Sequence, residues 1–399
     1  MQSRTGTLRY SILQALLWGE FGLLISFANP WLTERIGLSD TTAGIVLALA
    51  MGLALLMQPL LTSLIDRSPL SPRKVLMLSA LCCTVCCVIA PLFFGWMAIA
   101  LFSLACVCSQ MAPSFCNALG MQAIRGGMDI NFGAARGCGS VSFAICCQIE
   151  PMLNNAFGMD AIPYSSAVFA LLLCAAAWWM PEGEKSAAEA QEAPTPIRAF
   201  FKAHQRFALL LVSATFLYTA QNALGNFMFR VVQMKLPSGN SSEVLSVQGT
   251  ALMIAAFAEL PCMFLFKRMV KHVRCDIWMC LSAAFIVLRV FLALILPDVW
   301  GLYLAQLTQG LGYALFAVSS VYYVGYVIEK RNVVKGQTYL GATNTLGNLI
   351  AYLLGGMLID GIGTSGMLVT CIALAAVGVC LMLTSTEKVE KTENDCVHN

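Results

Sequence analysis

The chain consists of long apolar runs separated by short polar breaks. Each run holds about twenty residues, which is enough for a helix to cross the roughly 30 Å hydrocarbon core of a bilayer. The pattern therefore predicts an all-α integral membrane protein with twelve transmembrane helices. The predicted spans are residues 10–32, 41–65, 74–94, 96–120, 132–154, 161–180, 207–233, 245–266, 275–296, 300–326, 337–359 and 364–384.

The longest polar stretch ahead of the C-terminal tail falls after the sixth span. It divides the chain into an N-terminal six-helix half over residues 1–180, a cytoplasmic linker over 181–206, a C-terminal six-helix half over 207–385 and a tail over 386–399. The first apolar run is too long for the core of a signal peptide, so we interpret it as an uncleaved first span.

Basic residues are distributed unevenly between the two sides of this topology. With a cytoplasmic N-terminus, the internal loops and tails hold nineteen of the 24 Lys and Arg residues. These are Arg4, Arg9, Arg67, Arg73, Lys74, Arg125, Lys185, Arg198, Lys202, Arg206, Lys267, Arg268, Lys271, Arg274, Lys330, Arg331, Lys335, Lys388 and Lys391. Only Arg35, Arg230 and Lys235 fall on the external side. Because cytoplasmic loops are enriched in Lys and Arg, the bias predicts that both termini are cytoplasmic.

The composition agrees with a lipid environment and argues against nucleic-acid binding, ATP hydrolysis and metal binding. Apolar residues make up 58% of the chain and charged residues only 11%, whereas soluble domains carry about 25% charged residues. No basic tract suited to nucleic acid is present, and no ATP-binding P-loop. Most of the cysteines lie in apolar runs such as 81–90, where CxxC spacings resemble zinc sites. A buried apolar helix lacks the polar shell of such a site, so we interpret them as packing residues and predict no metal or cofactor.

Four ionisable residues inside predicted spans stand out: Glu20, Arg136, Glu259 and Arg289. Each costs roughly 2.5–3.5 kcal/mol near the bilayer centre on insertion scales, so each needs a partner or a wet cavity. Two acids and two bases are able to compensate one another. These four residues are therefore the first candidates for a functional site.

Glu20 lies in the middle of the first span. A carboxyl group at this depth can take up and release a proton as its surroundings change. We expect Glu20 to face a central cavity, to contact substrate or carry a proton, and to supply a carboxylate to Arg136. The alternative is a protonated glutamate that only bonds two helices together.

Arg136 begins the fifth span, and Ser140 and Phe143 follow four and seven residues later on the same helix face. A guanidinium can hold two hydroxyl groups and an aromatic ring can cover the apolar face of a pyranose, so we expect all three to bind substrate. In the alternative interpretation, Arg136 reaches out to lipid phosphates at the cytoplasmic boundary.

Glu259 and Arg289 lie in the eighth and ninth spans, and we expect them to form a buried pair. Buried ion pairs are poor stabilisers, so a pair that separates when the carboxyl is protonated is better explained as a coupling device than as a structural one. A purely structural ion pair is the alternative.

Neutral polar residues in other spans recur at helical spacing and favour a hydroxyl-rich substrate. The substrate-binding candidates among them are Asn117, Gln221, Asn222, Gln309 and Asn344. Alternatively, some of these side chains bond helices to one another.

Two six-helix halves joined by a cytoplasmic linker are the plan of the major facilitator superfamily, whose substrate site lies near the bilayer midplane. The loop after the second span resembles the gating motif of that superfamily in its acid–basic–basic order, with Asp66 and Arg67 followed by Arg73 and Lys74. It lacks the usual glycines, and a merely solvated loop would also carry these charges.

Several segments resemble the oligosaccharide–proton symporter (lactose permease-like) family of this superfamily. FGAAR, which ends at Arg136, is similar to the segment whose arginine binds sugar, and Phe143 stands in the place of a stacking tryptophan. AELP contains Glu259 and is similar to the segment of the coupling and sugar-binding glutamate. VLRV contains Arg289 and is similar to the segment of an arginine that assists proton release.

Other family positions have lost their charge. The position of the family's sugar-binding glutamate in the fourth span falls near Asn117 here. The position of the family's histidine in the tenth span corresponds to Gln309. The helix 7 acids and the helix 11 lysine correspond to neutral residues near Gln221 and Asn344. These departures bear on how a proton is released and on whether the solute is a disaccharide.

The resemblance implies a secondary active transporter and no enzyme. It imports a sugar or similar polyhydroxylated solute with protons by alternating access, as a monomer in the bilayer of a bacterial cytoplasmic membrane. A permease of the same fold for a nucleoside, an aromatic acid or an exported drug is the alternative, and a membrane enzyme or a sensor is a more distant one.

Overall fold

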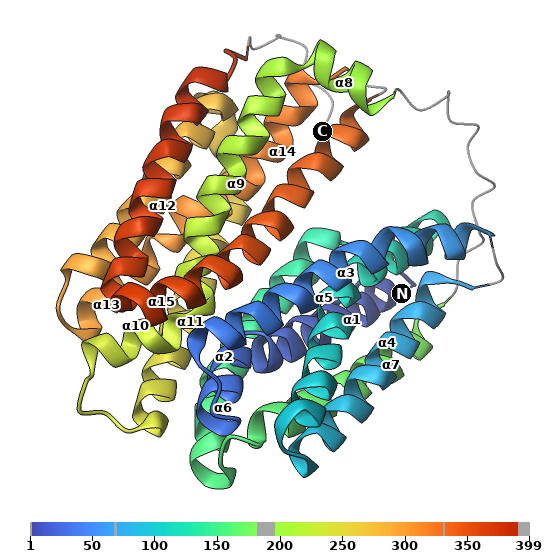
Figure 1. Cartoon of the computed structure of the whole chain (residues 1–399). Coiled ribbons are helices and arrows are strands. Elements are labelled where there is room, and N and C mark those ends of the chain that lie inside the picture. The colour runs from blue at the N-terminus through green and yellow to red at the C-terminus, as the bar shows by residue number, and fades with distance from the viewer. Residues whose placement is uncertain (1, 68–69, 182–195, 330–331, 390–399) are drawn as a thin grey trace. The chain divides into compact units, whose positions relative to one another are not determined.

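The computed structural model describes residues 2–67, 70–181, 196–329 and 332–389 (Figure 1). These residues form helices and irregular connections, and no strand occurs among them. The first helices are α1 (Gln2–Leu24), α2 (Ala28–Pro30), the π-helix η1 (Trp31–Arg35), α3 (Asp40–Arg67), α4 (Pro72–Ile89), the 3-10 helix η2 (Ala90–Leu92), α5 (Gly95–Arg125), α6 (Phe132–Phe157) and α7 (Ala161–Trp179). The remaining helices are α8 (Ile197–Ala203), α9 (Gln205–Asn226), α10 (Met228–Lys235), α11 (Ser241–His272), α12 (Cys275–Ile295), α13 (Val299–Leu307), the π-helix η3 (Gly310–Ala314), α14 (Leu315–Val327) and α15 (Val333–Ser385).

Helices are the expected outcome for these apolar runs, because a backbone without water must satisfy its N–H and C=O groups within the segment. Within the described ranges, ten helical segments are long and apolar enough to cross a bilayer. One of them, Lys335–Ser385, contains a break at Gly363, whose φ of 77° lies in the left-handed region that glycine adopts readily. This break separates two crossings.

The twelfth predicted crossing is α6, which is 26 residues long and interrupts its apolar sequence with Arg136, Gln148 and Glu150. It is not one of the ten apolar segments. At about 1.5 Å per residue, a helix of this length exceeds the hydrocarbon thickness. The described helices therefore account for all twelve predicted spans, and the prediction of an all-α membrane fold is confirmed.

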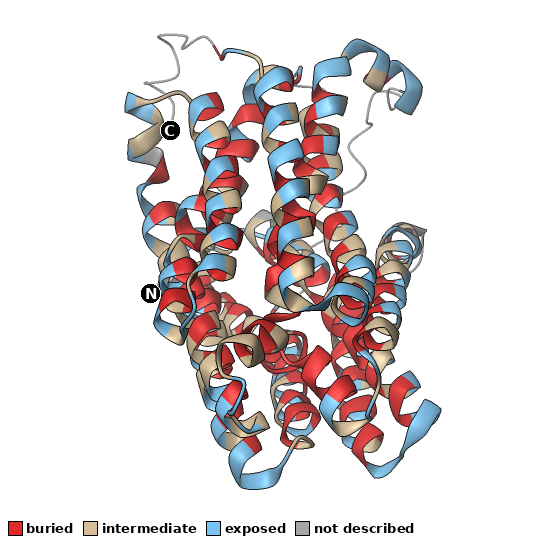
Figure 2. Ribbon diagram, turned by 60° about the vertical axis from the view of Figure 1, so that its left-hand side comes forward, coloured by how far each residue is buried: buried red, intermediate tan, exposed pale blue. Residues whose placement is uncertain are grey.

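The outward faces of the helices expose large apolar side chains. Leu49 and Leu56 of α3 are 69% and 65% exposed, and Trp96 and Trp178 are also exposed. Figure 2 shows exposed stretches along most of the long helices. Soluble proteins rarely expose apolar surface on this scale, and lipid tails are the environment that suits it.

The chain divides into two compact units. Unit 1 comprises residues 1–189 together with 225–257 and 352–364, and unit 2 comprises the rest. Unit 1 thus contains two segments from the C-terminal part of the sequence. The predicted halves and linker stay a prediction, and residues 182–195 of that linker and 390–399 of the tail lie outside the described residues.

Close helix packing within each unit depends on small residues. In unit 1, α1 packs against α6 and α7, and a Cβ at Gly139 of α6 would lie 2.6 Å from Trp18. In unit 2, α12 packs against α13, η3 and α14. The Ser213 hydroxyl of α9 donates to the carbonyl of Gly378 in α15 at 2.6 Å.

Candidate functional site

Polar side chains of α1 and α5 form a hydrogen-bonded chain inside unit 1. Trp18 donates from Nε1 to Oε1 of Gln14 at 3.0 Å. Gln14 donates from Nε2 to the hydroxyl of Tyr10 at 2.8 Å and to Oδ1 of Asn117 at 3.3 Å. Tyr10, Gln14 and Trp18 are four residues apart and share one face of α1. These hydrogen bonds fix the Trp18 ring. They also link it, through Gln14, to Asn117, a predicted substrate-binding residue.

Arg136 lies over the Trp18 ring, with its guanidinium carbon 3.9 Å from the ring centroid. Its Nη1 donates to Oγ of Ser140 at 3.2 Å, so the predicted pairing of these two residues on one helix face is confirmed. Phe143 follows on α6 and packs at Gly22 of α1, where an added Cβ would lie 3.2 Å from its ring. A cation held against an indole face is stabilised by the ring quadrupole. We call Gln14, Trp18, Asn117, Arg136 and Ser140 the indole cluster.

Glu20 is not part of the indole cluster. It is 2% exposed and accepts hydrogen bonds from Ser109 at 2.7 Å and from Cys83 at 3.5 Å. The predicted pairing of Glu20 with Arg136 is therefore wrong in this conformation. The reason is helix geometry, since Trp18 and Glu20 are two residues apart and point to different sides of α1. A role for Glu20 in proton or substrate binding stays a prediction.

Two glutamines and a glutamate form a second chain, inside unit 2. Gln221 of α9 donates from Nε2 to Oε1 of Gln309 at 2.5 Å. Gln309 in turn donates from Nε2 to Oε1 of Glu259 of α11 at 2.9 Å. Oε1 of Gln221 is buried and has no hydrogen-bond partner among the described residues. We call Gln221, Gln309 and Glu259 the amide relay.

A π-helix places Gln309 against Glu259. Gln309 directly precedes η3, and single π turns in helices are frequent at functional sites. Gly310, the first residue of η3, lies so close to α11 that an added Cβ would stand 2.0 Å from the carbonyl oxygen of Ala258. This backbone contact sets the distance across the relay. Nearby in sequence, Asn222 donates from Nδ2 to Oδ1 of Asn344 at 3.1 Å, which joins two further predicted residues.

Arg289 and Glu259 do not form the predicted direct pair. Arg289 is 2% exposed, and its Nη2 donates to Oε1 of Gln306 at 2.5 Å. Its Nε and Nη1 have no hydrogen-bond partner among the described residues. No hydrogen bond or ion pair joins Arg289 to Glu259 among the described contacts. Gln306 bonds to Arg289, and Gln309, one helical turn later, bonds to Glu259. Two carboxamides thus take the place of the predicted ion pair.

Replacing Gln306 with leucine is expected to destabilise the protein by about 2 kcal/mol, because the buried Arg289 loses a charge-assisted hydrogen bond. Gln306→Glu supplies a carboxylate of similar shape and is expected to unfold no earlier than the natural chain. Thermal unfolding of the purified proteins in detergent measures both. Equal melting temperatures for Gln306→Leu and the natural chain would contradict the prediction.

Three polar or ionisable side chains of unit 1 were not among the predicted site residues. Gln14 and Trp18 were missed, although their spacing from Tyr10 by fours is visible in the sequence. Glu150 of α6 was also missed; it is 1% exposed, accepts from Ser165 at 2.7 Å, and its Oε1 has no partner among the described residues. It is a further ionisable group inside a predicted span.

The predicted gating motif lies at the junction of α3 and α4. Asp66 and Arg67 form the end of α3, and Arg73 and Lys74 lie in the first turn of α4. Arg73 donates from Nη1 to the carbonyl of Met180 at 3.1 Å, which ties the start of α4 to the residue that follows α7. A gating role for the motif stays a prediction.

Comparison with known proteins identifies the family. The profile of the MFS_1-like family matches residues 7–381. No curated protein matches the chain. A mutant of the nucleoside transporter NupG is similar in structure with a TM-score of 0.82 and 16% identity, over 96% of this chain and 100% of that one. An inward-facing, unoccupied bacterial homologue of the human lysosomal transporter Spinster gives a TM-score of 0.68 and 12% identity, over 96% and 97%. A mutant of the peptide transporter POT gives 0.69 and 10%, over 96% and 93%.

At these identities the solved structures establish the fold alone, and the narrower likeness to oligosaccharide–proton symporters stays a prediction. The family profile covers nearly the whole chain. The chain therefore belongs to the MFS_1-like family of the major facilitator superfamily.

Proposed function

We propose that this protein imports a sugar or a similar polyhydroxylated solute together with protons, by alternating access. Its membership in the major facilitator superfamily makes it a secondary transporter. The observation that carries the substrate class is the indole cluster, in which Arg136 is stacked on Trp18 beside a hydroxyl and two carboxamides. A guanidinium fork binds adjacent hydroxyl groups, and carboxamides both donate and accept as hydroxyl groups do.

We assign proton coupling to the amide relay. While Glu259 is ionised it accepts from Gln309, and Gln309 accepts from Gln221. A protonated Glu259 can instead donate to Gln309. Rotation of both carboxamides then lets Gln309 donate to Oε1 of Gln221, the buried atom that now has no partner. The proton thus reverses the relay over its whole length. Oε1 of Gln221 gains a donor while its Nε2 takes the position that has no partner, so each protonation state has its own hydrogen-bond pattern.

A nucleoside is the second candidate substrate, and a specific observation favours it. The solved structure of a nucleoside transporter matches the fold over nearly the full length of both chains. The carboxamide pair Asn222–Asn344 and the amide relay also have the donors and acceptors that the edge of a nucleobase requires. Sugars and nucleosides share a hydroxyl-bearing ring, so the indole cluster suits both.

Uptake into membrane vesicles separates these candidates. Vesicles that contain the protein are energised with an inward proton gradient and offered labelled monosaccharides, disaccharides, nucleosides and dipeptides one at a time. We expect accumulation of one hydroxyl-rich class, simultaneous alkalinisation of the medium, and loss of accumulation with a protonophore. Accumulation of dipeptides alone, or uptake that ignores the proton gradient, would contradict the proposal.

A further inference from the structure

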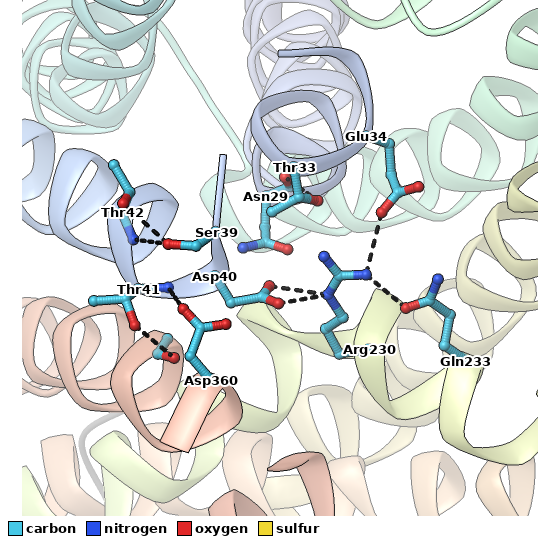
Figure 3. A network of polar contacts seen from close by, with 11 residues as sticks. Asn29, Thr33, Glu34, Ser39, Asp40, Thr41, Thr42, Arg230, Gln233 and Asp360 are labelled. Atoms are coloured by element: carbon cyan, nitrogen blue, oxygen red, sulfur yellow. Dashed lines mark hydrogen bonds and ion pairs between the residues drawn. The ribbon is translucent and has the colours of Figure 1, made fainter. Parts of the chain in front are cut away.

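A charged network joins residues from distant parts of the sequence inside unit 1 (Figure 3). Its centre is Arg230 of α10. The Nε atom of Arg230 donates to both carboxylate oxygens of Asp40, at 2.8 and 3.0 Å. Its Nη1 atom lies 3.1 Å from Oε1 of Glu34 and 2.7 Å from Oε1 of Gln233. One guanidinium from the C-terminal part of the sequence therefore holds two carboxylates from the N-terminal part.

A second contact crosses the same two parts of the sequence. The backbone N–H of Thr41, in the first turn of α3, donates to Oδ2 of Asp360 of α15 at 2.7 Å. The first N–H groups of a helix have no partner within the helix, and a negative charge is favourable there. Ser39 caps the same turn locally, since its Oγ accepts from the N–H of Thr42 at 3.1 Å. Asp360 adds a second acceptor from more than three hundred positions away.

Glycines let α3 and α15 touch backbone to backbone beside this cap. A Cβ at Gly44 would stand 2.3 Å from the carbonyl oxygen of Tyr352. A Cβ at Gly356 would stand 2.2 Å from the carbonyl oxygen of Asp40. Any side chain at either position pushes the two helices apart.

In the predicted topology, all these contacts fall on one face of the membrane. Glu34 and Asp40 flank the connection after the first span, Arg230 closes the seventh span and Asp360 ends the eleventh. Each follows an odd-numbered span, so they share the face opposite the N-terminus, which the charge bias predicts to be external.

We propose that Arg230 and Asp360 form a latch that holds the external gate closed, and that opening of the gate breaks both contacts. The inference rests on the proposed alternating-access function. The side chains of Arg230 and Glu34 are 19% and 23% exposed, so water can solvate them as soon as they part. The Asp40 side chain is 8% exposed, so its bond to Arg230 is the more buried contact of the network. Partly exposed ion pairs separate at a smaller cost than fully buried ones. A gate that opens and closes reversibly therefore needs contacts that water can reach.

The molecule contains a matched control on the same face. Arg35 lies 3.0 Å from Asp160, and its side chain is 19% exposed, as is that of Arg230. Both members of this control pair come from the N-terminal part of the sequence. Breaking it removes an equivalent interaction without releasing the segments around Arg230 and Asp360.

Hydrogen–deuterium exchange of the purified full-length protein in nanodiscs tests the latch. The variants are Arg230→Gln, Asp360→Asn and the control Arg35→Gln. In Arg230→Gln and Asp360→Asn we expect roughly tenfold faster exchange in peptides that cover residues 38–48 and 352–364, since charge-assisted hydrogen bonds are lost there. Arg35→Gln is expected to leave these peptides unchanged.

Gly356→Val keeps the charges and tests the same gate by steric separation; it is expected to accelerate exchange in the same peptides. Exchange at the natural rate in Arg230→Gln and Asp360→Asn would overturn the latch, as would equal acceleration in Arg35→Gln. The measurement uses neither substrate nor proton gradient. A chain that moves no sugar but shows the expected exchange refutes the proposed function alone, and an active transporter with unchanged exchange refutes the latch alone.

Discussion

Replacing Arg136 with glutamine is expected to lower uptake of the substrate at least about a hundredfold. The reason is that the guanidinium would no longer donate its two charge-assisted hydrogen bonds to hydroxyl groups of the substrate. Both energised uptake and counterflow are expected to fall together, since the defect lies in binding. Arg136→Lys retains the charge but not the fork and is expected to recover only part of the activity. Counterflow in vesicles preloaded with the substrate measures all three.

Arg9 provides the control for this prediction. Its guanidinium carbon lies 4.7 Å from the centroid of the Trp179 ring, so it is a second stacked arginine of the first helix bundle. It makes no contact with the indole cluster among those the structure describes. Arg9→Gln is expected to transport at close to the natural rate, and a comparable loss there would assign the effect to stability instead of binding.

Replacing Glu259 with glutamine is expected to abolish accumulation while counterflow continues. Glutamine cannot release a proton, so the amide relay is fixed in one pattern and the solute moves only down its own gradient. Uptake by the natural protein is expected to rise as the external pH falls, and uptake by Glu259→Gln to be independent of pH. The measurement is the ratio of internal to external substrate under an imposed pH gradient. A ratio for Glu259→Gln equal to that of the natural protein would contradict the prediction.

Glu20→Gln distinguishes the two carboxyl groups considered for coupling. Glu20 is enclosed by Ser109 and Cys83, and glutamine can keep both contacts. We therefore expect Glu20→Gln to accumulate the substrate as the natural chain does. Should Glu20→Gln lose accumulation while Glu259→Gln keeps it, proton coupling belongs to the first bundle and the amide relay is not its carrier.

The fold could be predicted from the sequence, because apolar runs of membrane length leave a backbone no alternative to helices. Local contacts were also predictable: Arg136 and Ser140 are four residues apart in one helix, and they bond. The long-range pairs were not. Glu259 and Arg289 were paired from their opposite charges and their places in adjacent spans, but the amides of Gln309 and Gln306 are their hydrogen-bond partners. Which residue of a neighbouring helix lies at the same depth depends on packing, here on the contact of Gly310 with α11.

The latch contacts could not be predicted from the sequence for a similar reason. Arg230, Glu34 and Asp40 lie at span ends, where charged residues are common and carry no signal of pairing. Glu34 belongs to a π-helix and Arg230 to a short helix after a break at Phe227, and neither irregularity is visible in the hydrophobic pattern. Their association became visible only when the helix ends were placed together.

At both Gly310 and Gly356, an added Cβ would collide with a backbone carbonyl of a neighbouring helix. The two contacts are needed in different states of the protein. The contact of Gly310 lies within unit 2, so a larger residue there strains the fold in every state of the cycle. The contact of Gly356 belongs to the proposed latch and is needed in the closed state only. A saturation library sorted for membrane abundance should deplete substitutions at Gly310 and tolerate them at Gly356. The same library sorted for growth on the transported solute should deplete both.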